Sequence, residues 1–225
     1  GGIIGSKIYY LIENLDRVII DPYGMIFSGA GLVFLGGLIG GTIGVTIVLR
    51  KNKLPWLQFA DIIAPLLIIG YSIGRVGCFL VGDDYGLPTK SIFGMSFKIG
   101  APPTTYESIA YNYPWLDMSN WNPGDIITVY PTQIIESIIG FGIFIFLWKK
   151  REKIITHGSL FFLYLIIAGM ERFLIEFIRL NPKYLWIVKD VIGFSGAQVI
   201  SLVMISIGIY MLMNPPQKSE TKEVS

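Results

Sequence analysis

Long apolar runs separated by short basic links constrain this chain more than any other feature of its sequence. A membrane-spanning helix needs about 20 mostly apolar residues. Five segments meet this requirement, namely Phe27–Leu49, Trp56–Val81, Pro131–Trp148, Gly158–Ile178 and Ile192–Met213. Charged residues make up only 15% of the chain, whereas a soluble domain carries about 25%. The sequence therefore predicts an all-α fold, a polytopic membrane helical bundle that forms a single domain over residues 1–213.

The two ends of the chain differ in character. The sequence opens with Gly1-Gly2-Ile3-Ile4-Gly5, without an initiator Met, and residues 1–12 are mostly apolar. We therefore expect an N-terminal truncation, with 1–12 as the remnant of a further span. Residues 214–225 are polar, and this composition predicts a disordered cytoplasmic tail.

The basic links predict how the chain is oriented in the membrane. Alternating spans place three basic clusters on one side, at residues 50–53, 149–153 and 218–222. An excess of Lys and Arg marks the cytoplasmic side. The segment 82–129, which is acidic and rich in Pro, Gly, Tyr and Trp, is then extracytoplasmic. We expect irregular structure there, serving either as a cap over a site or as a surface loop with aromatic anchors at the membrane interface.

Small residues recur in the first predicted span. Gly36, Gly40 and Gly44 are spaced four residues apart, so they lie along one side of a helix. Glycine at this spacing allows two membrane helices to pack closely. The sequence favours such packing over the alternative of a glycine-lined passage for lipid.

Ionisable residues inside the predicted spans are the best candidates for function, because a charge in the bilayer is costly unless it is paired. By the predicted topology these residues all lie toward the outer leaflet. They are Arg75 in the second span, Glu136 in the third, with the polar Gln133 one turn away, and Arg172, Glu176 and Arg179 in the fourth. Guanidinium groups bind phosphate through a rigid fork of donors. The pattern thus suggests a site for a phospholipid headgroup, and an Arg–Glu network that only holds helices together is the alternative.

The segment that follows Arg75 combines glycines with two carboxylates. Gly74, Gly77, Gly82 and Gly86 surround Arg75 and the Asp83-Asp84 pair. Such glycine density predicts a helix end that turns tightly and lets backbone approach a ligand. One of the two carboxylates is expected to bind a substrate group, and the other to cap or to face solvent. Cys78 is interpreted as a small core residue.

These motifs, in this order, resemble the prolipoprotein diacylglyceryl transferase family. The resemblance extends along nearly the whole chain, and Gly1 would fall within the second of the family's seven spans. The matching stretches are Gly36-Gly37-Leu38-Ile39-Gly40, Asp61-Ile62-Ile63-Ala64-Pro65, Gly74-Arg75-Val76-Gly77-Cys78-Phe79 with Gly82 and Gly86, Pro131-Thr132-Gln133 with Glu136, and Arg172-Phe173 with Glu176-Phe177 and Arg179.

The resemblance implies an enzyme of lipoprotein biosynthesis in the bacterial cytoplasmic membrane. Such an enzyme transfers a diacylglyceryl group from phosphatidylglycerol to the lipobox cysteine thiol of a prolipoprotein, at the outer face of the membrane. Its partners would be phosphatidylglycerol, the prolipoprotein signal peptide and the membrane, with no nucleic acid, metal or cofactor. The implied catalytic residues are Arg75, Arg172 and Asp83. The implied substrate-binding residues are Gly77, Cys78, Gly86, Tyr130, Gln133, Glu136, Glu176 and Arg179.

The chain departs from the family pattern at four positions. Leu35 stands where the family has histidine, Cys78 replaces an asparagine, Tyr130 a histidine and Ala168 a tyrosine. Leucine cannot accept a proton, so the expected acceptor is another group, chosen from Asp83, Glu136, Glu171 and Tyr130. The alternative function is a divergent phospholipid-binding or lipid-modifying membrane protein, with another acceptor or no turnover. A transporter is disfavoured, because the charges are not distributed through the depth of the membrane.

Overall fold

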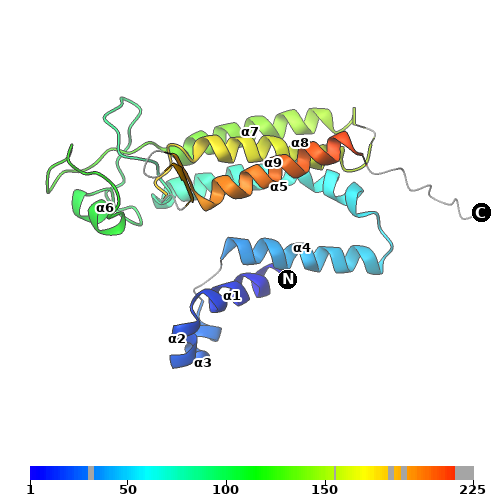
Figure 1. Cartoon of the computed structure of the whole chain (residues 1–225), viewed down its shortest axis with the longest axis horizontal. Helices are drawn as coiled ribbons and strands as arrows, with labels where there is room; N and C mark the ends of the chain where they lie inside the picture. The colour runs from blue at the N-terminus through cyan, green and yellow to red at the C-terminus, as the bar shows by residue number, and fades with distance from the viewer. Residues whose placement is uncertain (30–32, 155, 182–184, 189–191, 216–225) are drawn as a thin grey trace, which may run out of the picture. The chain divides into compact units, whose positions relative to one another are not determined.

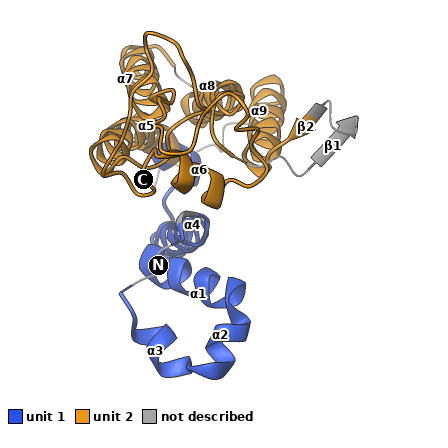
Figure 2. Cartoon of the chain, turned by 90° about the vertical axis from the view of Figure 1, so that its left-hand side faces the viewer, with its two compact units in different colours: residues 1–59 blue, residues 60–225 orange. Residues whose placement is uncertain are grey.

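The computed structural model describes residues 1–29, 33–154, 156–181, 185–188 and 192–215. The described part of the chain is mostly helical, as predicted. It divides into two compact units, residues 1–59 and residues 60–225, coloured blue and orange in Figure 2. The expected single domain over residues 1–213 stays a prediction. Residues 216–225, which carry most of the predicted tail, lie outside the described residues.

Close packing of two helices holds the first unit together. Its helices are α1 (Gly2–Glu13), α2 (Leu15–Ile20), α3 (Pro22–Phe27) and α4 (Phe34–Lys51). A Cβ on Gly40 would lie 2.9 Å from the Cα of Gly5, and one on Gly37 would lie 2.6 Å from the Oγ of Ser6. Side chains at these positions would therefore force α1 and α4 apart. The predicted role of the glycines in helix packing is confirmed for this face of α4.

The start of α4 differs from the predicted start of the first span. The sequence pattern places that start at Phe27, but Phe27 is the last residue of α3. Val33 is extended, with φ −80° and ψ 125°, and α4 begins at Phe34. Hydrophobicity alone does not reveal this break, because the residues on both sides of it are apolar.

Four long helices run side by side in the second unit (Figure 1). They are α5 (Trp56–Val81), α7 (Thr132–Lys150), α8 (Ser159–Ile175) and α9 (Gly196–Met213). Helices α8 and α9 make the closest approach, since a Cβ on Gly169 would lie 3.1 Å from the Ser201 carbonyl oxygen. Within the described ranges, α5, α7 and α9 are long and apolar enough to cross a membrane. The chain is thus a membrane protein, as the sequence predicts.

A short hairpin precedes the last helix, where the sequence pattern predicts a span beginning at Ile192. Strand β1 (Leu185–Val188) pairs antiparallel with β2 (Ile192–Phe194). Helix α9 begins only at Gly196, because Ser195 and Gln198 form a reciprocal capping box at that point. Such a box satisfies two backbone N–H groups that the first turn leaves free. The hydrophobic strand β2 therefore extends the apolar run without being part of the helix.

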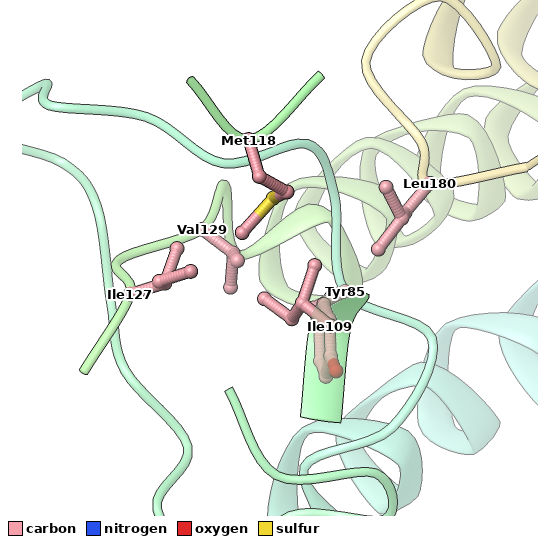
Figure 3. Close-up of a cluster of buried hydrophobic side chains, with 6 residues drawn as sticks. All are labelled: Tyr85, Ile109, Met118, Ile127, Val129 and Leu180. Carbon is pink, nitrogen blue, oxygen red and sulfur yellow. The ribbon is translucent and has the colours of Figure 1, made fainter. Parts of the chain in front are cut away.

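The segment between α5 and α7 lies at one end of this bundle and is mostly irregular, as predicted (Figure 1). It contains one short helix, α6 (Tyr106–Asn112), and a hydrophobic core of its own. Figure 3 shows the buried side chains of that core: Tyr85, Ile109, Met118, Ile127, Val129 and Leu180. Leu180 follows α8 in sequence, so the core also fixes the chain just beyond the end of α8.

Candidate active site

Gly86 lies where three segments of backbone meet. Its N–H donates to the Tyr130 carbonyl at 2.8 Å, and the next N–H, that of Leu87, donates to the Ile178 carbonyl at 2.8 Å. A Cβ on Gly86 would lie 2.5 Å from the Ile178 oxygen and 2.7 Å from the Thr132 Cγ2. The absence of a side chain therefore lets the chain after α5, before α7 and after α8 converge. The predicted site residue Gly86 has a packing role that positions the charged groups around it.

Two arginines and two carboxylates form a closed ring of ion pairs beside this junction. Arg75 extends from α5, Glu136 from α7, and Arg179 from the chain after α8, while Asp84 follows α5. Arg75 Nε lies 2.6 Å from Glu136 Oε2, and its Nη1 lies 2.8 Å from Asp84 Oδ2. Arg179 closes the ring, with Nη1 3.0 Å from Glu136 Oε1 and Nη2 3.0 Å from Asp84 Oδ1. Each carboxylate thus bridges both arginines.

The two carboxylates of the ring have very different environments. The Glu136 side chain is fully buried, whereas the Asp84 side chain is 46% exposed. Glu136 also accepts a hydrogen bond of 2.6 Å from the Tyr71 hydroxyl. The Arg75 guanidinium carbon lies 5.1 Å from the centre of the Tyr71 ring, within the range of a cation–π contact. Glu136 is therefore the interior counter-ion of the pair of arginines, and Asp84 is the outer one.

Glu176 links the ring to Arg172. Its Oε2 lies 3.1 Å from Arg172 Nη2 and 3.8 Å from Arg179 Nε, and its Oε1 accepts from Asn181 at 2.8 Å. Arg172 and Glu176 meet at i, i+4 spacing at the end of α8. The expected single helix face does not extend to Arg179, which lies beyond the end of α8 and pairs with Gly86 in an isolated bridge. Two buried guanidinium nitrogens, Arg172 Nη1 and Arg179 Nε, have no hydrogen-bond partner in the described residues. These are spare N–H donors inside the network.

The Asp83 carboxylate lies near that of Asp84 but forms no ion pair with the arginines of the ring within the described residues. The Asp83 backbone carbonyl accepts from Gln133 Nε2 at 2.5 Å. Its Oδ1 and the Gln133 Oε1 are buried, and neither has a hydrogen-bond partner within the described ranges. The Asp84 carbonyl accepts from the Thr132 hydroxyl at 3.0 Å. The start of α7 therefore holds the backbone of both aspartates.

Cys78 lies close to the two aspartates. The ligand atoms of Cys78, Asp83 and Asp84 lie within 4.8 Å of one another. However, the Arg75 Nη1 lies 3.9 Å from the Cys78 sulfur and is ion-paired with Asp84. A guanidinium group in this position disfavours a metal cation there.

The other predicted site residues, Gly77 and Tyr130, form no side-chain hydrogen bond or ion pair with the ring within the described part of the chain. Gly77 is exposed on α5, and a Cβ there would meet open space. Tyr130 pairs through its backbone with Gly86 and Leu87. Ala168 is buried in the bundle core with Ile68 and Leu147, and it precedes Arg172 on α8. Leu35 lies on α4, in the other unit.

Sequence reasoning did not select Asp84, a member of the ring, or Tyr71, which donates a hydrogen bond to Glu136 of the ring. Tyr71 carries a usable signal, because it lies four residues before Arg75 and hence on the same helix face. Asp84 carries none that separates it from Asp83. The placement of Asp84, and not Asp83, in the ring depends on the left-handed backbone conformation of Asp84, with φ 55°, which only the structure reveals.

The electrostatics of Asp84 follow from its neighbours. Burial acts to raise the pKa of its carboxyl, but the positive charges of Arg179 and Arg75 outweigh this effect. The pKa of Asp84 therefore lies below its ordinary value, and the group is ionised at neutral pH. The ring carries two positive and two negative charges in this state.

Comparison with known proteins identifies the family to which this arrangement belongs. Residues 1–214 match the model of the family described as prolipoprotein diacylglyceryl transferase. The chain belongs to this family. It is 34% identical to a phosphatidylglycerol–prolipoprotein diacylglyceryl transferase of Clostridium tetani, over 94% of this chain and 75% of the relative. A second such enzyme, from Clostridium perfringens, is 35% identical over 99% of this chain and 77% of its own length. A third, from Chlorobaculum tepidum, is 34% identical over the whole chain and 74% of the relative.

By sequence resemblance, Arg75 and Arg172 correspond to the essential arginines of the diacylglyceryl transferase family. The geometry places both in one continuous network through Glu136, Arg179 and Glu176. The predicted constellation therefore comes together at one end of the bundle, beneath the irregular segment. The family likeness and the charge network thus point to the same part of the molecule.

Proposed function

We propose that this protein transfers a diacylglyceryl group from phosphatidylglycerol to the lipobox cysteine thiol of a prolipoprotein. In this reaction the thiol sulfur forms a bond to the glyceryl carbon, the carbon–oxygen bond to phosphate breaks, and glycerol phosphate leaves. The membership of the chain in the transferase family supports this function, as do the three named transferases to which it is similar. A lipid-binding protein without turnover is not favoured, because the matched relatives are named as transferases.

The observation that carries the proposal is the network of three arginines at one end of the spans. Guanidinium groups bind phosphate oxygens in a rigid, charge-assisted geometry. The Arg172 Nη1 donor has no hydrogen-bond partner within the described residues and is available for such an anion. The same groups stabilise the charge that develops on the leaving phosphate, and fixed donors in a dry site do so strongly. We propose Arg75, Arg172 and Arg179 as the headgroup-binding residues.

The thiol also needs a proton acceptor, and Asp83 is our proposal. Of the candidates from the sequence, Glu136 is held by two arginines and a tyrosine hydroxyl, so its oxygens are engaged. Glu171 is 8% exposed and lies within the bundle on α8. Asp83 is half-buried in the outer segment and has a buried oxygen without a partner within the described residues.

A comparison of two amide variants tests this assignment. We expect Asp83→Asn to lower kcat about 100-fold or more, as for loss of a general base, while KM for phosphatidylglycerol stays the same. Glu171→Gln is expected to change kcat far less, because its carboxyl lies deeper in the bundle. The measurement is transfer of diacylglyceryl to a lipobox peptide in detergent micelles. A larger loss of kcat in the Glu171 variant would identify Glu171, and not Asp83, as the proton acceptor.

We also propose the orientation and location of the site. The outer ends of α5, α7 and α8 and the irregular segment face the extracytoplasmic side, and the membrane is the bacterial cytoplasmic membrane. The basic residues at the opposite ends of the helices support this, since Lys149 and Lys150 lie in the last turn of α7 and Arg50 and Lys51 in the last turn of α4. Such residues are enriched on the cytoplasmic side.

Complementation tests the function itself. A bacterium depleted of its own transferase is expected to regain lipoprotein modification with the wild-type gene and not with Arg75→Ala. Arg151→Ala is the matched control, because Arg151 is an arginine beyond the end of α7 that contacts the exposed Glu152 and the Trp148 ring, away from the charge network. We expect this control to complement fully. A wild-type protein that inserts in the membrane but leaves the lipobox cysteine unmodified would rule out the proposed function.

A further inference from the structure

Asp84 binds the arginine pair in the way that a phosphate group would. Its two oxygens lie 2.8 Å and 3.0 Å from nitrogens of two different arginines, Arg75 and Arg179. The two non-bridging oxygens of a phosphodiester offer the same pair of charged acceptors, and charge-assisted bonds of this length suit both anions. The carboxylate therefore occupies the part of the arginine pair that faces outward, where an anionic headgroup would approach.

Charge balance makes simultaneous binding unfavourable. Arg75 and Arg179 together carry two positive charges, and Glu136 and Asp84 together carry two negative ones. A phosphate that joined this set would leave an uncompensated negative charge in a partly buried site, which is costly. One of the two carboxylates must therefore leave the arginine pair when a phosphate binds.

Asp84 is the carboxylate that can leave. Glu136 is fully buried and is also held by the Tyr71 hydroxyl, so its release would strand a charge in the interior. The Asp84 side chain is 46% exposed and can turn into water. Its backbone has φ 55°, a left-handed conformation that is uncommon for a residue other than glycine. The Thr132 hydroxyl holds the Asp84 backbone through its carbonyl, so the side chain can turn away while the backbone stays anchored.

We propose that Asp84 is an exchangeable counter-ion that occupies the phosphate position on Arg75 and Arg179 and is displaced when an anionic lipid headgroup binds. The proposal rests on the proposed function for the identity of the lipid, phosphatidylglycerol. In the absence of lipid, the Asp84 carboxylate keeps the two arginines paired and preorganised. A lipid headgroup that binds must compete with this side chain for the arginines.

The test is the affinity of the purified full-length protein for phosphatidylglycerol, with Asp84→Asn compared to wild type. The amide keeps the shape of the side chain but removes the competing charge, so we expect about fivefold tighter binding, the size of effect expected for one exposed ion pair. Asp117→Asn is the matched control. It is an aspartate of the same outer segment whose Oδ1 bonds only the nearby Ser119 N–H, and it should bind as wild type does.

Probes of different charge separate exchange from a general change in the site. The gain is expected with phosphatidylglycerol and with sn-glycerol 1-phosphate, which share the phosphate, and not with uncharged diacylglycerol. If Asp84 only positions the arginines, Asp84→Asn will bind phosphatidylglycerol with unchanged or lower affinity, and the proposal is overturned. A gain for diacylglycerol as well would also overturn it. Because these measurements need no turnover, they decide the exchange even if the proposed transfer reaction is absent.

Discussion

Glu136 is the single residue on which most of the charge network depends. Its carboxylate accepts from Arg75, Arg179 and the Tyr71 hydroxyl, and its side chain is fully buried. Removal of one partner of a buried ion pair leaves the other charge uncompensated, which costs about 3–5 kcal/mol. We therefore expect Glu136→Gln to lower the free energy of unfolding by about this amount and to abolish transfer.

Thermal unfolding in detergent, followed together with transfer activity, checks this prediction. Glu152→Gln provides the comparison, since the Glu152 side chain is 80% exposed and lies beyond the end of α7. That variant should match wild type in both measurements. A Glu136→Gln protein with wild-type stability would mean that the two arginines find other counter-ions.

The same residue scale shows what the sequence can and cannot predict. Arg172 and Glu176 were predictable as a pair, because i, i+4 spacing places them on one helix face. Arg179 joins them from the chain beyond α8, where helical spacing no longer applies. The choice between Asp83 and Asp84 was not predictable, because it depends on the backbone dihedrals of a loop. The predicted role of Glu136 in substrate binding stays a prediction, and its place as the buried counter-ion of two arginines is visible only in the structure.

At the scale of elements, α8 depends on a residue of another helix for its start. Asp61 of α5 accepts from the Gly158 N–H at 2.6 Å and from the Phe161 N–H at 2.9 Å. The carboxylate therefore does for α8 what an N-cap side chain normally does from within the same segment. Asp61 is separated from Gly158 by 97 residues in the sequence, so local capping patterns do not reveal this bond.

We expect Asp61→Ala to destabilise the protein by about 1–2 kcal/mol, the typical cost of a lost N-cap. The effect should appear as a lower unfolding temperature, with little change in KM for lipid, because Asp61 and the arginine network lie toward opposite ends of α5. Hydrogen exchange of the first turn of α8 should increase. Equal exchange in the variant and in wild type would show that the first turn needs no cap.

The junction at Gly86 joins three elements and gives a second prediction at this scale. We expect Gly86→Ala to lower activity strongly, because the added methyl would lie 2.5 Å from the Ile178 oxygen and 2.9 Å from the Tyr130 Cβ. Gly142→Ala on α7 is the control, since a Cβ there meets no atom within 4 Å. Transfer assays and unfolding temperatures of both variants check this. Wild-type activity of Gly86→Ala would mean that the junction can open without harm to the network.

At the scale of the whole molecule, the irregular segment and the helical bundle are distinct parts that meet at the charge network. The segment has its own core, in which the Tyr85 and Phe97 rings stack 5.9 Å apart. The bundle was predictable from apolar runs. The interior of the segment was not, because its buried residues are scattered through an irregular chain without a periodic pattern. The two units of the chain were likewise not visible in the hydrophobic pattern.

Because Asp84 joins the outer segment to Arg75 of α5 and to Arg179 after α8, the stability of the molecule should depend on its ionisation. The pKa of Asp84 in the folded protein lies below its ordinary value of about 3.9. The ion pairs therefore contribute stability above that ordinary value, and the contribution is lost as the pH falls through the lower pKa of the folded state. Since the side chain is 46% exposed, we expect a contribution of up to about 1 kcal/mol.

Asp84→Asn should accordingly unfold about 2–4 °C below wild type at pH 7, and the difference should vanish at a pH below the folded pKa. Unfolding temperatures in detergent across this range check the prediction, with Asp117→Asn measured alongside. The same variant is expected to bind phosphatidylglycerol more tightly, so stability and lipid affinity should change in opposite directions. If the ion pairs serve stability alone, the variant will bind lipid with unchanged affinity. If Asp84 is an exchangeable counter-ion, its removal will lower stability and raise lipid affinity.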